Sequence, residues 1–164
     1  MSKIYSREKL KEELDRHRTR GEKVVFTNGC FDILHVGHTR YLREARKMGD
    51  VLVLALNSDT SVRAIKGEHR PLISEDERAD VVASLESVDY VIIFNEHTPL
   101  ELIEYLKPDI LVKGGDWKEE NVVGRESVEK WGGRVVIIPE VRGASTTNII
   151  ERLINTFRGK SWKE

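Results

Sequence analysis

Short, continuous apolar runs alternate along this chain with segments that have the spacing of amphipathic helices. Runs such as Val51 to Leu56 are typical of strands buried on both faces of a sheet. Strands that alternate with helices pair in parallel through right-handed crossovers, so helices cover both faces. The pattern therefore predicts an α/β fold, a Rossmann-like doubly wound sheet of about five parallel strands. The expected strands are residues 24–26, 51–56, 90–94, 110–112 and 135–138.

The segments between the apolar runs carry signals for helix starts and stops. Ser74 with Glu77 has the spacing of a capping box. Thr98 precedes Pro99 and a glutamate, which predicts another capping box with proline at the first helical position. The last helix is expected to start at 145–147 and to pack against the core through one stripe, because its apolar residues recur at helical spacing. That stripe is Ile149, Ile150, Leu153, Ile154 and Phe157.

The 164 residues suffice for one domain with a substantial core. We expect a single domain, 1–164, with a leading helix in 1–21 and a Rossmann-like core over 22–158, the helix lying outside that core. A net charge of -1 gives no basic excess of the kind that binds nucleic acid. One cysteine fits a reducing compartment, and neither a signal peptide nor a membrane span is recognisable. The sequence thus predicts a cytoplasmic protein that partners neither nucleic acid nor membrane.

The stretch 26–38 is the strongest candidate for the chemistry. It runs from the first apolar strand through a turn to the start of a helix, where it places His35 and His38. Backbone N–H groups at a helix start lack intrahelical partners and attract phosphate. Two imidazoles three residues apart can donate to one anion, and protonation near neutral pH would add charge. Gly37 between them would let a ligand approach the backbone.

Three other interpretations of this stretch stay open at this point. The two histidines with Asp32 could ligate a metal ion, although no third strong ligand lies at a usual zinc spacing. They could be ordinary surface or capping residues. Cys30 near His35 could suggest a thiol nucleophile, whereas a lone cysteine beside an apolar strand more often fills space in the core.

Further polar clusters follow the later strands, at the edge where ligands bind in parallel sheets. The hydroxyl residues 145–147, Ser-Thr-Thr, are compatible both with a helix cap and with an anion site. Lys66 and Arg70 are either solvated loop charges or groups that close over a polyphosphate. Residues 113–117 are either an ordinary turn or a site where glycines admit a ligand, Asp116 accepts from a sugar hydroxyl and Trp117 stacks. No P-loop, Gly-x-Gly-x-x-Gly or serine triad is present.

Taken together, these elements resemble the HIGH-type nucleotidyltransferase superfamily, and within it the adenylyltransferases of ADP-heptose synthesis. The matching elements are the His-x-Gly-His of 35–38, the stretch 26–32, Asn57-Ser58-Asp59, Lys66-Gly67 with Arg70-Pro71, 112–116 and 145–150. The resemblance covers nearly the whole chain. It implies transfer of AMP from ATP to D-glycero-beta-D-manno-heptose 1-phosphate, giving ADP-heptose and pyrophosphate for lipopolysaccharide core synthesis, the sugar phosphate coming from a separate kinase.

The resemblance also implies roles for particular residues. His35, His38 and Lys66 would be catalytic and act on the phosphates, with Mg2+ held largely by substrate and water rather than by a protein cage. Asp32 would order the loop after the first strand. A homo-oligomer, such as a dimer, is the expected assembly. Substrate binding would fall to Asn28, Gly29, Cys30, Phe31, Asp32, Gly37, Arg70, Lys113, Gly115, Asp116, Trp117, Ser145, Thr146 and Thr147.

One departure from the superfamily bears on the nucleotide. Cytidylyltransferase relatives typically carry Arg-Thr-Glu-Gly-Ile before the Ser-Thr-Thr signature, whereas this chain has Glu140-Val141-Arg142-Gly143-Ala144. ATP is therefore expected rather than CTP, and no role is carried over to Arg142. The alternatives are an adenylyl- or cytidylyltransferase for glycerol phosphate, pantetheine phosphate or a flavin, a module that senses ATP without turnover, and a metal-binding structural domain.

Overall fold

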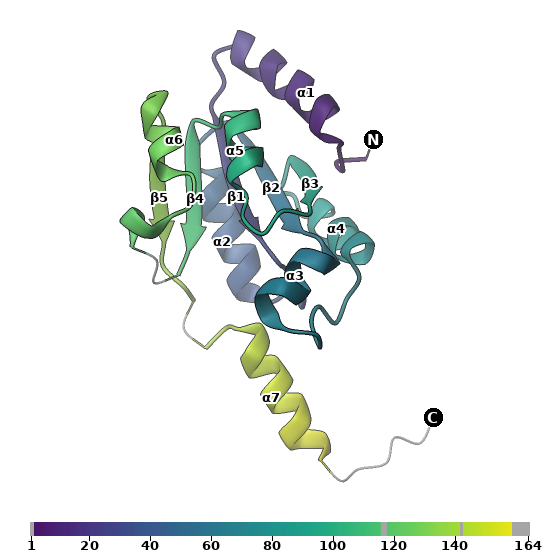
Figure 1. Cartoon of the computed structure of the whole chain (residues 1–164). Helices are drawn as coiled ribbons and strands as arrows, with labels where there is room; N and C mark the ends of the chain where they lie inside the picture. Colours follow the sequence, from purple (N-terminus) through teal and green to yellow (C-terminus); the bar gives the residue numbers. More distant parts are fainter. Residues whose placement is uncertain (1, 116–117, 142, 159–164) are drawn as a thin grey trace.

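In this computed structural model, residues 2–115, 118–141 and 143–158 are described, so Asp116, Trp117 and Arg142 lie outside the described residues. The described chain has one five-stranded sheet of order β3-β2-β1-β4-β5, and its paired strands are all parallel. The doubly wound parallel sheet is thus confirmed (Figure 1). The strands are β1 Val24–Gly29, β2 Val51–Asn57, β3 Tyr90–Phe94, β4 Ile110–Gly114 and β5 Arg134–Ile138.

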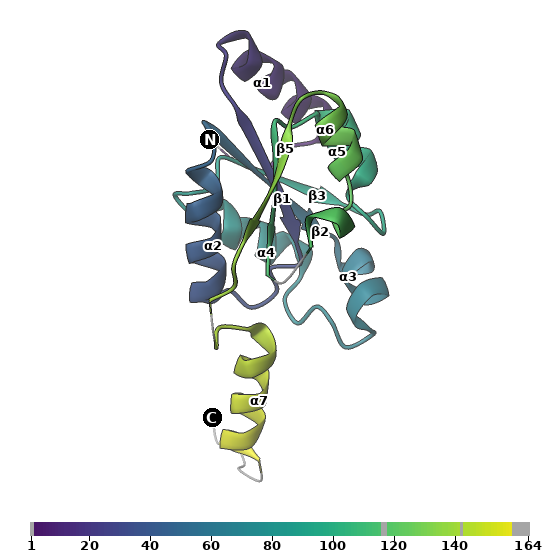
Figure 2. The same cartoon turned by 90° about the vertical axis from the view of Figure 1, so that its left-hand side faces the viewer.

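Helices cover both faces of the sheet, as Figure 2 shows with α2 on one side and α5 and α6 on the other. Successive residues of a strand point to opposite faces. In β2, Val53 and Ala55 join the core under α1, α5 and α6, while Leu52, Leu54 and Leu56 join the core under α2 and α4. The helices are α1 Arg7–Thr19, α2 Val36–Arg46, α3 Asp59–Lys66, α4 Glu75–Ala83, α5 Leu100–Leu106, α6 Arg125–Lys130 and α7 Thr146–Phe157, with a 3-10 turn η1 Glu119–Asn121.

Aspartates satisfy backbone groups at the amino ends of the strands. Asp109 accepts from the backbone N–H of Val24 at 2.9 Å, and Asp89 accepts from that of Leu52 at 2.7 Å. Each carboxylate thus ties the loop before one strand to the start of the neighbouring strand. These hydrogen bonds close the ends of the ladder, where buried N–H groups would otherwise lack partners.

The leading helix belongs to the core, so the expectation that it lies outside is wrong. Leu10 and Leu14 are fully buried in the core that α1 shares with β1, β3 and α5. The segment before α1 also extends the sheet, because Ile4 forms a parallel bridge with Val91 of β3. Two leucines at i and i+4 predict an apolar face but do not say that the sheet will cover it.

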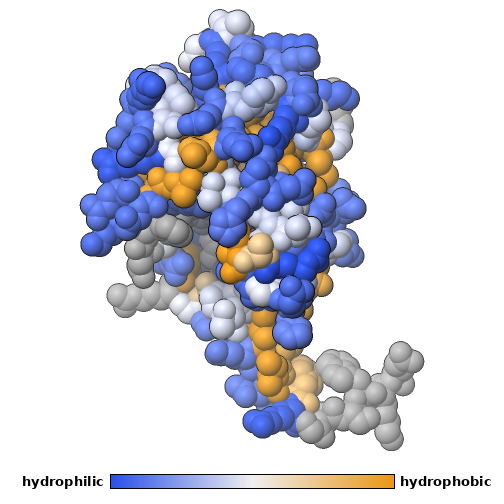
Figure 3. Space-filling view, viewed as in Figure 1, coloured by the Kyte–Doolittle hydropathy of each residue, from blue (hydrophilic) through white to orange (hydrophobic). Residues whose placement is uncertain are grey.

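The last helix contradicts its expected packing. No residue of α7 is buried, and Leu153 and Ile154 are 48% and 58% exposed. Figure 1 shows α7 extending away from the sheet, and in Figure 3 apolar side chains form a band along it. Periodicity shows that apolar residues share a face, but the connection after β5 decides where that face lies.

Helix α5 begins later than its capping signal predicts. Its N-cap is Pro99, no side chain caps it, and the Pro99 carbonyl accepts from the N–H of Ile103 at 2.9 Å. Thr98 therefore lies outside the helix and does not cap it. Proline stands at the cap position rather than at the first helical position.

Within the described ranges, no helix is long and apolar enough to cross a membrane.

Candidate active site

A cavity of about 780 Å³ lies at the carboxyl ends of the strands. This edge includes the switch point of the sheet, where β1 lies between β2 and β4 and the strand order reverses, the usual ligand site in such folds. Most of the predicted site residues meet in its wall. They are Asn28, Gly29, Cys30, Phe31, Asp32, His35, His38, Lys66, Arg70, Lys113, Ser145, Thr146 and Thr147.

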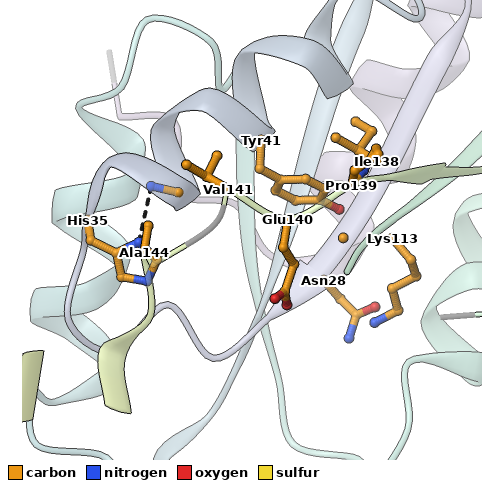
Figure 4. Close-up of a pocket in the computed structure, with 11 residues that line it drawn as sticks. Asn28, His35, Tyr41, Lys113, Ile138, Pro139, Glu140, Val141 and Ala144 are labelled. Atoms are coloured by element: carbon orange, nitrogen blue, oxygen red, sulfur yellow. Dashed lines mark hydrogen bonds between the residues drawn. The ribbon is translucent and has the colours of Figure 1, made fainter. Parts of the chain in front are cut away.

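The two histidines lie together at the start of α2. Their rings stack with centroids 3.9 Å apart. His35 is the N-cap of α2, and its Nδ1 accepts from the N–H of Gly37 at 3.1 Å, the dashed bond in Figure 4. A neutral His35 ring then carries its proton on Nε2, so that nitrogen is free to donate to a ligand. The capping interpretation is thus correct for His35, and it fixes the orientation of the ring.

The structure explains the glycine at position 37 differently from the sequence-based expectation that it leaves room for a ligand. A Cβ at Gly37 would lie 2.8 Å from Nδ1 and Cε1 of His35 and 3.2 Å from Cβ of Ala144. The space that we expected a ligand to enter is occupied by the His35 ring itself. Glycine at this position lets the imidazole fold back onto the helix start, although Gly37 also lines a smaller cavity beside the main one.

The positive charge expected on the histidines near neutral pH is absent. Burial, and to a lesser degree the neighbouring His35, lowers the pKa of His38 to about 4, and burial also lowers the pKa of His35. Both rings are therefore neutral at pH 7. The His38 Nδ1 atom is buried and has no hydrogen-bond partner among the described residues, and the same holds for Oδ1 of Asn28. Buried polar atoms without partners are rare and mark a place for a ligand or ordered water.

Phe31 holds the loop before the histidines in a strained conformation. Its φ is 45°, in the left-handed region that side chains rarely adopt. The Phe31 ring lies 5.1 Å from the His38 ring, and a Cβ on Gly29 would come within 2.9 Å of Phe31. Backbone strain of this kind persists where the surrounding structure enforces it, commonly at functional sites.

Asp32 connects that loop to the segment after α3. Its buried carboxylate accepts from Arg70 Nε at 2.7 Å and from the backbone N–H groups of Leu72 and Ile73 at 3.0 Å. Because these donors occupy the carboxylate, the geometry does not favour a metal site shared with the histidines. Asp32 instead brings Arg70 to the cavity wall.

Arg78 of α4 supports the same loop and was missed by the sequence analysis. Its side chain is fully buried and donates to the carbonyls of Cys30 and Ile73 and, at 2.8 Å, to Asp59 Oδ1. An arginine on a polar helix gives no sequence signal of this role, since such residues are usually exposed. Only the packing of α4 against the loop reveals it.

Lys113 and Glu140 lie where the main cavity joins the smaller one, of about 220 Å³. Figure 4 shows the side chains of Asn28, Lys113 and Glu140 around this opening. Burial lowers the pKa of Lys113 to about 8, so its positive charge persists at pH 7. Glu140, which sequence reasoning treated only as a departure from the family, faces Gly115 closely, since a Cβ there would lie 2.8 Å from Glu140 Oε1. Gly115 is not among the described residues that line either cavity.

The start of α7 serves as both a helix cap and a cavity wall. Ser145 is the N-cap and accepts from the N–H of Asn148 at 3.0 Å, while Thr146 Oγ1 donates to the carbonyl of Ile33 at 3.4 Å. The two interpretations of this signature are therefore compatible. The contact with Ile33 joins the start of α7 to the loop that carries the histidines.

The thiol interpretation receives no support from the geometry. Burial raises the pKa of Cys30, so the thiol stays protonated at neutral pH. Within the described ranges there is likewise no group of three or more His, Cys, Asp or Glu side chains that could hold a metal ion. Neutral imidazoles, cations and small hydroxyls, which suit a phosphate, line the cavity together with the Glu140 carboxylate.

The two stacked histidines at a helix start, at the switch point of a Rossmann-like sheet, are the arrangement that the resemblance to nucleotidyltransferases predicts, and comparisons with known proteins agree on that class. Residues 26–152 match the model of the cytidylyltransferase-like family, and the chain belongs to that family. The superfamily resemblance found in the sequence is thereby confirmed.

Similarity to curated proteins points to a particular member of this family. The chain is 60% identical over 156 residues to the bifunctional protein HldE of Syntrophotalea carbinolica and 58% identical over 156 residues to that of Pelobacter propionicus. Each match covers 95% of this chain but 32% of the relative, so the chain spans about a third of the length of these proteins.

Solved structures agree with the fold. The lipopolysaccharide core biosynthesis protein from Thermoplasma volcanium superposes with a TM-score of 0.63 at 32% identity, covering 76% of this chain and all of that one. Pantothenate synthetase from Thermus thermophilus superposes with a TM-score of 0.62 at 18% identity over 90% of this chain and 67% of its own length, which shows a shared fold alone.

Proposed function

We propose that this nucleotidyltransferase moves AMP from ATP to D-glycero-beta-D-manno-heptose 1-phosphate, giving ADP-heptose and pyrophosphate. The observation that carries the proposal is the stacked pair His35 and His38 at a helix start, in one cavity wall with Lys66, Lys113 and the start of α7. The identity to HldE and the likeness to a lipopolysaccharide core biosynthesis protein support the choice of heptose.

The reaction needs positioning and charge stabilisation rather than a protein nucleophile. A phosphate oxygen of the sugar phosphate attacks the α-phosphorus of ATP, the bond from that phosphorus to the bridging oxygen breaks, and pyrophosphate leaves with the electron pair. His35, through Nε2–H, and His38, through its N–H, donate to phosphate oxygens on which charge increases. Binding of an anion would favour protonation of both rings, which are neutral without it.

Cations and hydroxyls around the histidines complete the proposed phosphate site. Lys113 lies at the junction of the two cavities and would meet the triphosphate, while Lys66 and Arg70 lie toward α3. Ser145 and Thr146 would hold the outer phosphates and so place the leaving group. The smaller cavity has apolar side chains, Ile138, Pro139, Val141 and Ala144, in a wall that also holds polar groups, and this mixture suits the apolar face and polar edge of a base.

Mg2+ fits this donor set as an ion carried by the substrate. The side chains around the cavity are mostly cations, imidazoles, amides and hydroxyls, whereas Mg2+ prefers oxygen ligands and keeps several waters. When bound, it would neutralise charge between phosphate groups. Phosphate oxygens and water would hold it, with the side-chain oxygens of Ser145, Thr146 and Glu140 in the same cavity wall.

The proposal extends to the setting of the enzyme. ATP and a sugar phosphate would be its small-molecule partners, the cytoplasm its location, and a homo-oligomer such as a dimer its assembly. The curated relatives are bifunctional and about three times as long, so we propose that another protein or segment supplies the phosphorylated heptose.

The test is to incubate the purified chain with ATP or CTP and a panel of acceptors, and to measure pyrophosphate release. The panel holds the heptose phosphate, glycerol 3-phosphate, pantetheine phosphate and flavin mononucleotide. Release with ATP and the heptose phosphate, well above the other pairs, is the expected result. Preference for another acceptor or for CTP would contradict the proposal, and tight ATP binding without release would indicate a sensing module.

A further inference from the structure

Thr98 lines the main cavity instead of capping α5. Its position before Pro99 and a glutamate predicts a helix cap, yet the cap is Pro99 and no side chain bonds to the helix start. Thr98 is half-buried and is part of the cavity wall together with His97. The Thr98 hydroxyl makes no hydrogen bond within the part of the chain that the structure describes.

The loop between β3 and α5 is held firmly where it meets the cavity. Glu96 forms an ion pair with Arg7 of α1, and its carbonyl accepts from Ser61 Oγ at 3.1 Å. Ser61 in turn accepts from Asn57 Nδ2 at 2.9 Å. This chain of bonds joins the end of β2, α3 and the loop, so His97 and Thr98 are presented on a supported backbone, as a binding site requires.

The loop lies across the sheet from the proposed base site. The smaller cavity joins the main one beside Lys113 and Glu140, at the β4 and β5 side of the sheet. His97 and Thr98 follow β3, the strand at the opposite edge. A nucleotide with its base in the smaller cavity and its phosphates at the histidines leaves this far end of the main cavity free for the second substrate.

The chemistry of the far end suits a phosphorylated polyol. A threonine hydroxyl and an imidazole each donate and accept hydrogen bonds, as sugar hydroxyls do. Lys66 of α3 supplies a cation for the phosphate, and Ile65 and Pro99 supply apolar contact. We propose that Thr98 and His97 bind the hydroxyl groups of the acceptor sugar phosphate and help to select it, a role that rests on the proposed adenylyl transfer.

The test compares Thr98→Val, which removes the hydroxyl but keeps the shape, with Thr98→Ser, which keeps the hydroxyl. KM is measured separately for the acceptor and for ATP, with the heptose phosphate and glycerol 3-phosphate as acceptors. Thr156→Val on the exposed face of α7 is the matched control. His97→Ala is paired with His69→Ala, an exposed histidine that is not among the cavity-lining residues.

We expect Thr98→Val to raise KM for the acceptor about three- to tenfold, the usual worth of one hydrogen bond, while KM for ATP stays within about twofold. Thr98→Ser should restore the wild-type value. An unchanged KM for the acceptor, or equal rises in both KM values, would overturn the proposal.

Failure of the proposed function leaves a different signature, because the wild type would then release no pyrophosphate with the heptose phosphate. In that case calorimetric titration of the wild type and Thr98→Val with heptose phosphate and with glycerol 3-phosphate decides. Weaker binding of either compound by the variant, with unaltered ATP affinity, supports the acceptor site, and equal or absent binding in both proteins refutes it.

Discussion

The two ends of the parallel strands differ in how their polar groups are satisfied. At the amino ends, Asp109 and Asp89 bond to backbone N–H groups and close the ladder. At the carboxyl ends, His38 Nδ1 and Asn28 Oδ1 are buried without a partner among the described residues. Folding therefore completes one edge of the sheet, whereas the other edge keeps buried polar atoms that a ligand or ordered water can satisfy.

Polar residues alone do not identify a site, because both edges have them. Asp32 at the carboxyl edge is as fully bonded as Asp109 at the amino edge, and it acts by holding Arg70 and the loop. What marks the functional edge is the combination of unpaired buried atoms, the strained Phe31 and a cavity. The comparison predicts that substitutions at the two edges separate activity from stability.

The largest effect is expected for His38→Ala. Removing a donor to the charge that develops in the transition state lowers turnover by about a hundredfold or more. The free energy of unfolding should fall only through the lost ring contacts with His35 and Phe31, because the buried Nδ1 has no hydrogen-bond partner to lose. Pyrophosphate release and urea unfolding measure the two quantities, with His69→Ala as control. Near-normal turnover in a folded variant would remove His38 from the mechanism.

Asp109→Ala should show the opposite pattern. It removes the acceptor for the Val24 N–H and lowers the free energy of unfolding by about 1 to 2 kcal/mol. The kcat/KM of the folded variant should stay close to the wild-type value, since the residue lies at the far edge from the cavity. A large loss of activity at temperatures where the variant is folded would show that the two edges are not independent.

The pH dependence of the free energy of unfolding tests whether His38 is buried and neutral in the folded chain. The pKa of His38 is about 4 in the folded chain against an ordinary value of 6.5, so the unfolded chain binds more protons between these values. The free energy of unfolding should therefore fall as the pH decreases through this window. Urea unfolding at about pH 7 and about pH 5 should show a smaller decrease for His38→Gln than for the wild type. Equal decreases would mean that His38 is not the group that titrates.

The smallest effect is expected in α7. Leu153 is 48% exposed, so Leu153→Ser should change the free energy of unfolding by less than about 0.5 kcal/mol, as surface substitutions do. Leu14→Ala is the contrasting variant, because Leu14 is fully buried and its truncation should cost about 2 to 5 kcal/mol. A comparable loss at Leu153 would show that something covers the α7 stripe in solution.

Local signals predicted most of the fold. The run Val51 to Leu56 is a strand buried on both faces, and Ser74 with Glu77 forms the expected capping box. Such features depend on residues that are close in the sequence, so they can be predicted without the tertiary structure. The same holds for the meeting of the histidines with Lys113 and the start of α7, because parallel strands bring their carboxyl ends to one edge.

Contacts between distant segments could not be predicted. Arg78 reaches Cys30 across 48 positions, and α1 is buried because the sheet covers Leu10 and Leu14. The histidines are likewise neutral because they are buried, and the spacing of residues in the sequence does not reveal burial. Thr98, which we propose binds the acceptor, lines the cavity although its local sequence predicts a helix cap.

The sequence by itself determined the alternation of strands and helices, the parallel sheet and the edge at which the candidate site lies, because periodicity and chain direction are local properties. Tertiary structure alone decided which polar atoms stay unpaired, which charges are suppressed and which apolar faces are covered. Those properties depend on what surrounds each atom, and the surroundings come from segments far away in the chain.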